Sequence, residues 1–441
     1  MPLQLSVAFS LCVLVCQLLA PVTAGAASPT ENAVRPNIVF IFADDVGQEV
    51  LGCYGGTSYA TPHLDRLASV GIRFRHAYAM PMCHPSRICL LTGRYPLHVG
   101  NPAWGSFPQE LESQTLAHVL KKAGYATAVS GKWQLTLQRK KPQHPRTLGF
   151  DESCVFGWHE GPRYYRPLIW QNGELRPELA EKYGPDVYVD FLIRFMERNR
   201  ERPFFAFYSM AFCHDVSNDF EIPVPRGPKG RYDSFKEMAE GMDERVGRIV
   251  SALDRLDLRK RTLFLYTTDN GTAAKHIATA KGKQLITEEI VSMAKGREVR
   301  GGKGQLTDAG TRVPMLANWP GTIAPGQVVD DLVDLSDFLP TFAALAGAPS
   351  PAGVKLDGHS FVGRLLRGEA SRRTWAFAQA RGRFFVRTQQ YKLYSDGRLF
   401  DVAADREEQT ALDRETLDPE ARAVARELEL AVQALSASGA R

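Results

Sequence analysis

The stretch NIVFIFADDVG, residues 37–47, sets the expectation for the fold. An unbroken apolar run over 37–43 follows Pro36 and ends at two adjacent aspartates, Asp44 and Asp45. A strand that is buried on both faces of a parallel sheet has this continuous apolar pattern. Similar runs occur at 125–131, 204–210, 262–268 and 313–319. We therefore expect a large, mostly parallel central sheet that contains all five runs.

Helical patterns lie between these runs. In 238–256 apolar residues recur at helical spacing, at Met242, Val246, Ile249, Val250, Leu253 and Leu256. Strands that alternate with helices predict an α/β fold with functional loops at the carboxyl ends of the strands. Beyond residue 370 the pattern changes to short strand-like pieces and a polar amphipathic helix near 415–437. This part predicts a smaller α+β unit with a short antiparallel sheet.

The composition is that of a globular protein with one large and one smaller domain. The chain has 441 residues, of which 44% are hydrophobic and 23% are charged. Lys and Arg together number 54 against 49 Asp and Glu, a mild excess that permits anionic substrates. Because the chain has no stripe of arginines and aromatics, we expect no binding of nucleic acid.

The N-terminus has the pattern of an export signal. Residues 5–20 are almost wholly apolar, and Ala24 and Ala26 satisfy a small-x-small cleavage pattern. We expect a signal peptide over 1–26, its removal, and a periplasmic or secreted protein without stable membrane insertion. The segment has no basic residue before the apolar run, so a retained N-terminal anchor stays an alternative.

Removal of this leader leaves an odd number of cysteines. The five are Cys53, Cys83, Cys89, Cys154 and Cys213. In an oxidising compartment an unpaired cysteine calls for an explanation. If Cys83 is chemically consumed, four thiols remain and allow up to two disulfides, but the spacing does not indicate which pairs form.

Polar residues follow two of the predicted strands. Asp44 and Asp45 end the first run, and Asp269 and Asn270 end the run at 262–268. If these strands are neighbours, the four side chains form a set of oxygen ligands for a hard cation such as Ca²⁺ or Mg²⁺. The alternatives are a turn or helix cap at the Asp pair and a glycan at Asn270, which begins an Asn-Gly-Thr sequon.

The stretch MCHPSRICLLTGR, residues 82–94, resembles the sulfatase family. A zinc site at Cys83, His84 and Cys89 does not fit the usual paired spacing, and a Cys83–Cys89 disulfide is awkward at the start of a helix. Sulfatases carry Cys-x-Pro-Ser-Arg followed by Leu-Thr-Gly-Arg, as this stretch does. Blocks similar to theirs occur in the family's order at 35–47, 59–79, 124–135, 262–271, 300–321 and 399–409.

The resemblance implies an alkaline-phosphatase-like catalytic domain over 34–370 and a smaller C-terminal domain over 371–441. It also implies that a formylglycine-generating enzyme converts Cys83 to formylglycine. The hydrated aldehyde attacks the sulfur of a sulfate ester, and its second hydroxyl then expels sulfate. Asp44, Asp45, Asp269 and Asn270 are the implied ligands of one Ca²⁺, completed by the modified Cys83.

Four further residues match catalytic positions of the family. Arg87 matches the residue that supports the diol and its charge, and Lys132 and Lys303 match residues that hold the sulfate oxygens. His214 matches the position that helps to protonate the leaving group. Without the resemblance, each lysine reads as a surface residue and His214 as an ordinary loop histidine.

One block departs from the family pattern. Where the family has histidine in GKWHLG, this chain has Gln134 in GKWQLT. A glutamine side chain can form hydrogen bonds to the substrate or the diol but cannot act as a general base. Slower turnover, replacement by another group such as His84, a distinct subfamily arrangement and loss of activity are the possible consequences.

The substrate is left open by the sequence. The basic stretch 273–300 contains Lys275, His276, Lys281, Lys283 and Arg297, which either face a polyanionic glycan or are simply solvated. The aromatic stretch 154–170 either supplies sugar-stacking subsites or belongs to the core. We expect an exported sulfatase that acts on a sulfated small molecule or saccharide, most simply a sulfated carbohydrate. A phosphate mono- or diester hydrolase and a non-catalytic binder of sulfated glycans are the alternatives.

Overall fold

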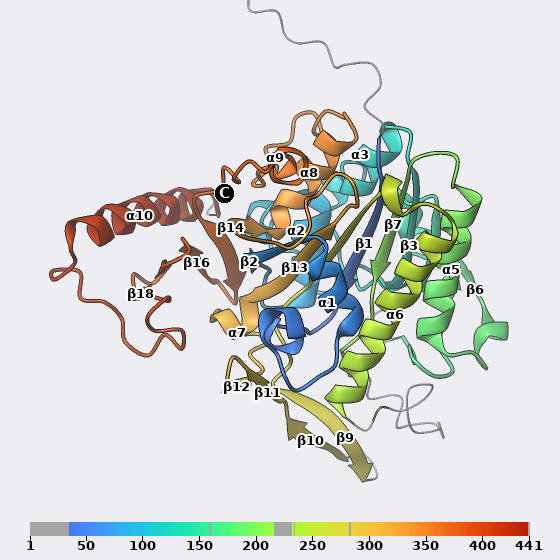
Figure 1. Ribbon diagram of the computed structural model, residues 1–441, viewed down its shortest axis with the longest axis horizontal. Coiled ribbons are helices and arrows are strands. Elements are labelled where there is room, and N and C mark those ends of the chain that lie inside the picture. Colours follow the sequence, from blue (N-terminus) through green and yellow to red (C-terminus); the bar gives the residue numbers. More distant parts are fainter. Residues whose placement is uncertain (1–34, 158–159, 216–231, 233, 282–283, 440–441) are drawn as a thin grey trace, which may run out of the picture. The chain divides into compact units, whose positions relative to one another are not determined.

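The computed structural model describes residues 35–157, 160–215, 232, 234–281 and 284–439 (Figure 1). Residues Arg35–Arg441 form one compact unit. The predicted signal peptide, residues 1–26, lies outside the described residues. Within the described ranges, no helix combines the length and the apolar character needed to cross a lipid bilayer.

The core of the unit is a ten-stranded sheet. Its strands are β14 (Gln327–Asp334), β2 (Ile72–Tyr78), β13 (Arg312–Asn318), β8 (Thr262–Thr268), β1 (Asn37–Ala43), β7 (Phe204–Ser209), β3 (Ala126–Lys132), β4 (Glu152–Phe156), β5 (Trp170–Gln171) and β6 (Glu174–Leu175), in that spatial order. Strand β1 lies between β7 and β8, is parallel to both and is buried along its whole length. The prediction of a mostly parallel central sheet is confirmed.

The run at 313–319 lies in the predicted sheet as one of its antiparallel strands. This run forms β13, which is antiparallel to both β8 and β2. The described residues between β8 and β13 form two hairpins and the short helix α7 (Asp308–Thr311), with no crossover helix that returns the chain to the amino ends of the parallel strands, and a parallel connection requires such a crossover. The apolar pattern correctly predicts burial, but it does not specify strand direction.

Helices cover both faces of the sheet (Figure 1). Helices α1 (Pro62–Ser69), α5 (Gly184–Arg198) and α6 (Phe235–Arg255) share one apolar cluster with Val39 and Ile41 of β1. Helices α2 (Cys83–Thr92), α3 (Leu116–Lys122) and α8 (Phe338–Leu345) contribute to a second cluster with Ile38, Phe40 and Phe42. Successive side chains of β1 therefore enter opposite cores, as the pleat of a strand requires. The helix predicted over 238–256 is α6.

Shorter elements complete the unit. The remaining short α-helices are α4 (His144–Thr147), α7 (Asp308–Thr311) and α9 (Val362–Arg367). The 3-10 helices are η1 (Gln48–Val50), η2 (Gly52–Tyr54), η3 (Pro96–Val99), η4 (Gln109–Leu111), η5 (Pro177–Leu179), η7 (Arg259–Arg261) and η8 (Leu335–Asp337). Two hairpins follow β8, namely β9 (Lys275–Lys281) with β10 (Gln284–Glu289), and β11 (Val291–Ala294) with β12 (Arg297–Arg300).

The C-terminal part forms the small antiparallel sheet that the sequence predicts. Strands β15 (Ala376–Ala380), β16 (Arg383–Arg387), β17 (Tyr391–Tyr394) and β18 (Leu399–Asp401) pair in sequence order. The terminal helix α10 (Pro419–Gly439) contacts β16 and β17. The domain boundaries at 370 and 371 stay a prediction, because both parts belong to one compact unit.

The cysteines of the described residues are all free thiols. Cys89 is fully buried inside α2, so the structure favours a packed thiol at this position over a disulfide.

Candidate active site

The four predicted oxygen ligands meet at the carboxyl edge of the sheet. The last residue of β1, Ala43, is in register with Thr268 at the end of β8, so Asp44 and Asp269 follow neighbouring strands. The backbone N–H of Asp269 donates to the carbonyl of Ala43 at 3.0 Å, which extends the ladder into the site. Asp44, Asp45, Asp269 and Asn270 are each at most 2% exposed.

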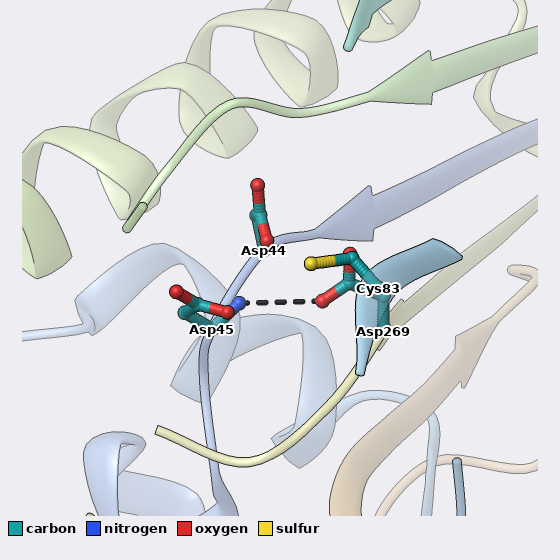
Figure 2. Close-up of side chains that lie close together, drawn as sticks. All are labelled: Asp44, Asp45, Cys83 and Asp269. Carbon is teal, nitrogen blue, oxygen red and sulfur yellow. Dashed lines mark hydrogen bonds between the residues drawn. The ribbon is translucent and has the colours of Figure 1, made fainter. Parts of the chain in front are cut away.

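Cys83 lies beside these residues at the start of α2. Figure 2 shows its sulfur pointing toward the aspartates, and one ligand atom from each of Asp44, Asp45, Cys83 and Asp269 lies within 4.8 Å of the others. Ser86, one turn along α2, donates its hydroxyl to the backbone carbonyl of Asp269 at 2.5 Å. Burial raises the pKa of the Cys83 thiol to about 11, so an unmodified Cys83 is a neutral thiol near neutral pH.

The unused polar atoms of the site fit a hard cation. Asp44 Oδ1 and Asn270 Oδ1 are buried and have no hydrogen-bond partner among the described residues. The Asn270 amide N–H donates to Asp45 Oδ1 at 2.7 Å and to the carbonyl of Gly271 at 2.8 Å, which leaves its oxygen free. Burial and the nearby charge of Asp44 raise the pKa of Asp269. A cation that binds oxygen ligands would coordinate the two free Oδ1 atoms and compensate the negative charge of the carboxylates. Ca²⁺ and Mg²⁺ both prefer oxygen ligands.

The burial of Asn270 also argues against a glycan at the Asn-Gly-Thr sequon. Its side chain is 0% exposed and belongs to the hydrogen-bonded cluster. Asp44, Asp45, Cys83 and Asp269 are the only group of His, Cys, Asp and Glu side chains with metal-binding geometry in the part of the chain that the structure describes. A two-metal site, which would favour a phosphate-ester hydrolase, is therefore not present among those residues.

Each aspartate is paired with one cationic side chain. Lys132 Nζ contacts Asp44 Oδ2, Lys303 Nζ lies 2.7 Å from Asp45 Oδ2, and Arg87 Nη2 lies 2.8 Å from Asp269 Oδ2. Burial alone would raise the pKa of Asp44, but the positive charges of Lys132, Lys303 and Arg87 hold it below its usual range. The carboxylates and cations balance in charge, which makes their joint burial possible.

Arg87 is fixed by three polar contacts and one ring. Besides Asp269, its guanidinium donates to the carbonyl of Lys132 at 3.3 Å and to the Ser209 hydroxyl, and it lies 5.3 Å from the centre of the Phe42 ring. Ser209 also donates to the carbonyl of Lys132. Sequence reasoning did not identify Ser209, although a serine near the end of the apolar run at 204–210 is a signal for it.

His214 lies on a small cavity at this edge. The cavity has a volume of about 170 Å³ and is lined by Asp45, His214, Asp215, His276 and Lys303, among others. Its volume is below the roughly 300–1,000 Å³ of a typical small-molecule site. It suits an anionic head group, such as a sulfate, better than a whole substrate.

The imidazole of His214 is held in one orientation. Its Nδ1 donates to the carbonyl of Asp215 at 2.5 Å, and the Tyr164 hydroxyl donates to the carbonyl of His214 at 3.0 Å. Burial and the charge of Lys303 lower the pKa of His214 to about 3. The resting ring is therefore neutral, and because Nδ1 carries the hydrogen, Nε2 has the free lone pair.

Gln134 and His84 do not join the cluster by hydrogen bonds. Gln134 is 2% exposed, has a φ of 54°, and its Oε1 has no partner among the described residues. The Nε2 atom of His84 lies 2.8 Å from the carbonyl of Ser106, and its ring stacks on Trp104. His84 therefore contacts Ser106 and Trp104 and forms no hydrogen bond with the cluster. These contacts do not support a role for His84 in place of the histidine that the family has at position 134.

The two stretches considered for substrate contact differ in position. Lys275 and Arg297 line a larger cavity of about 790 Å³, and Lys281 ends β9, while Lys283 lies outside the described residues. His276 lies on the 170 Å³ cavity instead. In the stretch 154–170 the side chains of Phe156, Tyr164 and Ile169 are at most 2% exposed, so they belong to the core.

Comparison with known proteins gives one family for almost the whole chain. The family model described as Sulfatase matches residues 36–348, and a second model, for the C-terminal part of N-sulphoglucosamine sulphohydrolase, matches residues 302–437.

Individual relatives agree with these models. Mouse steryl-sulfatase is 33% identical over 437 residues, which cover 78% of this chain and 67% of the relative. N-acetylgalactosamine-6-sulfatase from Rattus norvegicus is 32% identical over 416 residues and covers 86% and 75%. The solved structure of Ps i-CgsB superposes with a TM-score of 0.73 and 25% identity over 92% of this chain and 93% of that one, and that protein is also solved in complex with k-i-k-neocarrahexaose.

Proposed function

This chain belongs to the sulfatase family and is a sulfuric ester hydrolase, and from this premise we propose that it is an exported, formylglycine- and Ca²⁺-dependent enzyme that removes sulfate from a sulfated carbohydrate. The observation that carries the proposal is the convergence of Asp44, Asp45, Asp269 and Cys83 within 4.8 Å at one edge of the sheet.

We assign Asp44, Asp45, Asp269 and Asn270 as the ligands of one Ca²⁺, with the modified Cys83 completing the set. The bound ion supplies positive charge that stabilises the sulfate oxygens and favours the ionised nucleophile. The free Oδ1 atoms of Asp44 and Asn270 support this assignment. The pairing of each carboxylate with its own cation helps to orient the ligand oxygens.

We assign Cys83 as the precursor of the nucleophile. Formylglycine supplies a hydrated aldehyde whose two hydroxyls serve successively in attack and in release of sulfate. Conversion also replaces a thiol that burial keeps protonated near neutral pH. Arg87 acts through its contacts with Asp269, Ser209 and the carbonyl of Lys132, so it positions the ligand shell and adds positive charge behind it.

Lys132 and Lys303 are assigned to the sulfate oxygens. Both ammonium groups are at most 16% exposed and already face the carboxylates of the cluster, so they present their positive charge where the anion enters. His214 is assigned to the leaving oxygen. Since its resting ring is neutral, it takes up a proton when the anionic ester binds and donates it as the alcohol leaves.

The carbohydrate substrate is supported by relatives rather than by a bound ligand. One relative is named for sulfated N-acetylgalactosamine and one structural neighbour has been solved with an oligosaccharide, while another relative is named for steroid sulfates. A cavity of about 790 Å³ adjoins the small cavity beside His214, and its volume lies within the roughly 300–1,000 Å³ of a small-molecule site.

The test is sulfate release by protein that has been coexpressed with a formylglycine-generating enzyme. We expect hydrolysis of para-nitrophenyl sulfate and of at least one member of a panel of sulfated saccharides and steroid sulfates, with the saccharide preferred by kcat/KM. The Cys83→Ala variant should be inactive on every substrate. Full activity of that variant, or preference for phosphate esters, would contradict the proposal.

A further inference from the structure

Three cavities adjoin one another along one side of the protein. The catalytic cavity of about 170 Å³ shares Lys275 and Ile290 with the larger cavity of about 790 Å³. The larger cavity in turn shares Tyr54, Lys295, Arg312 and Arg406 with a third cavity of about 380 Å³. The shared lining residues place the larger cavity between the small cavity beside His214 and the third cavity.

The third cavity is strongly cationic. Five cations line it, namely Arg73, Arg75, Lys295, Arg312 and Arg406, against a single carboxylate, Asp330. These cations come from β2, from the turn between β11 and β12, from the start of β13 and from the loop after β18. The fold thus brings together side chains that are far apart in the sequence.

The available carboxylates do not neutralise these cations. Asp330 is taken by Arg75, with both oxygens within 3.1 Å of Nη1. The nearest carboxylate to Arg312 is Asp308 at 3.5 Å, but Asp308 lies closer, at 2.6 Å, to the buried Arg387.

The other three cations of the third cavity have no carboxylate partner within the described part of the chain. Among the described residues, Arg73, Lys295 and Arg406 form no ion pair, and Arg73 lies 5.2 Å from the centre of the Tyr54 ring. Partial burial and the positive charges of Arg406, Arg312, Arg73 and Arg75 lower the pKa of Lys295. A bound anion would relieve this repulsion.

We propose that Arg73, Lys295, Arg312 and Arg406 form a second anion site, separate from the catalytic centre, which binds a sulfo group farther along a sulfated glycan chain. The inference rests on the proposed function, because the chain whose ester is cleaved at Cys83 is the one that reaches the second site through the larger cavity.

The geometry favours an extended polyanion over a small one. A monosaccharide sulfate in the catalytic cavity has no group that extends past the larger cavity, whereas an oligosaccharide with several sulfo groups does. Arginine donors match the oxygens of a sulfo group, and the charge excess attracts the chain at a distance. The enzyme should consequently prefer longer sulfated chains.

The test compares two charge-matched triple variants in the inactive Cys83→Ala background. The site variant carries Arg73→Gln, Lys295→Gln and Arg406→Gln. The control variant carries Lys122→Gln, Arg255→Gln and Arg426→Gln, which are exposed cations of α3, α6 and α10. Binding of a heparin disaccharide, a heparin octasaccharide and an unsulfated octagalacturonate is measured by calorimetry at low and at physiological ionic strength.

We expect the site variant to raise the Kd of the heparin octasaccharide about tenfold, with little change for the disaccharide and for the control variant. Equal weakening by both variants, no weakening by either, or equally tight site-dependent binding of octagalacturonate would overturn the assignment.

The same two triple substitutions in the Cys83 enzyme separate the two proposals. Hydrolysis of para-nitrophenyl sulfate should be unchanged in both, because none of the six residues belongs to the catalytic cluster. Absence of that hydrolysis in the wild type would contradict the proposed function while leaving the glycan-binding result interpretable.

Discussion

The substitution Asp44→Asn tests the cation site without a measurement of catalysis. It keeps the shape of the side chain but removes one of three buried carboxylates whose oxygens meet Cys83. Ca²⁺ at a hundred times its Kd should stabilise the wild type by about 2.7 kcal/mol. For a cooperative unit of roughly 400 residues, the unfolding entropy is about 0.85 kcal/mol/K, so the expected rise in Tm is about 3 °C.

Thermal unfolding of the wild type and of Asp44→Asn is followed at pH 7.5 after chelation and after addition of Ca²⁺. We expect the shift of about 3 °C in the wild type and none in the variant. The matched control is Asp243→Asn, which alters a buried carboxylate on α6 that accepts the backbone N–H groups of His63 and Leu64. The control should keep the full Ca²⁺ shift, whatever its own Tm. A full shift in Asp44→Asn would refute the assignment of this ligand.

Three further outcomes follow from the contacts. His214→Gln should reduce kcat by roughly 100-fold or more on a saccharide sulfate, whose alkoxide leaves poorly, and far less on para-nitrophenyl sulfate; equal losses on both would contradict its role at the leaving oxygen. Arg373→Met should destabilise the protein by about 3–5 kcal/mol in denaturant titration, because it leaves the buried Asp334 and Asp337 unpaired, whereas Arg367→Met at an exposed pair should change nothing measurable. Burial raises the pKa of Asp243 to about 6 in the folded state. Its contribution to the free energy of unfolding should therefore be full below about pH 4 and be lost by about pH 6. Asp243→Asn should flatten the dependence of this free energy on pH between these values.

Local sequence patterns predict much of the fold because burial determines them. The run at 37–43 forms β1 and the pattern at 238–256 forms α6. Both agree with the prediction because an apolar strand or helix face must be buried against another layer of the domain. The direction of β13 is not accessible in this way. It depends on where the chain re-enters the sheet after 40 or so intervening residues, which is a property of the connection and not of the strand.

The candidate site shows the same division. Asp44, Asp269 and Cys83 could be predicted because strand ends in an α/β sheet share one edge and because the motif around Cys83 is specific. Ser209 could not be predicted, since its importance comes from lying between Arg87 and the carbonyl of Lys132. The cationic cavity around Lys295 was also inaccessible, because its members come from four separate segments of the chain.

Mass spectrometry of the tryptic peptide that contains Cys83, from protein coexpressed with a formylglycine-generating enzyme, is the most direct test of the proposed mechanism. The mechanism requires a peptide about 18 Da lighter than the unmodified one, the difference between a thiol-bearing methylene and an aldehyde, with sulfate-releasing activity that rises in proportion to the converted fraction. Full activity of protein in which Cys83 remains an unmodified thiol would contradict it.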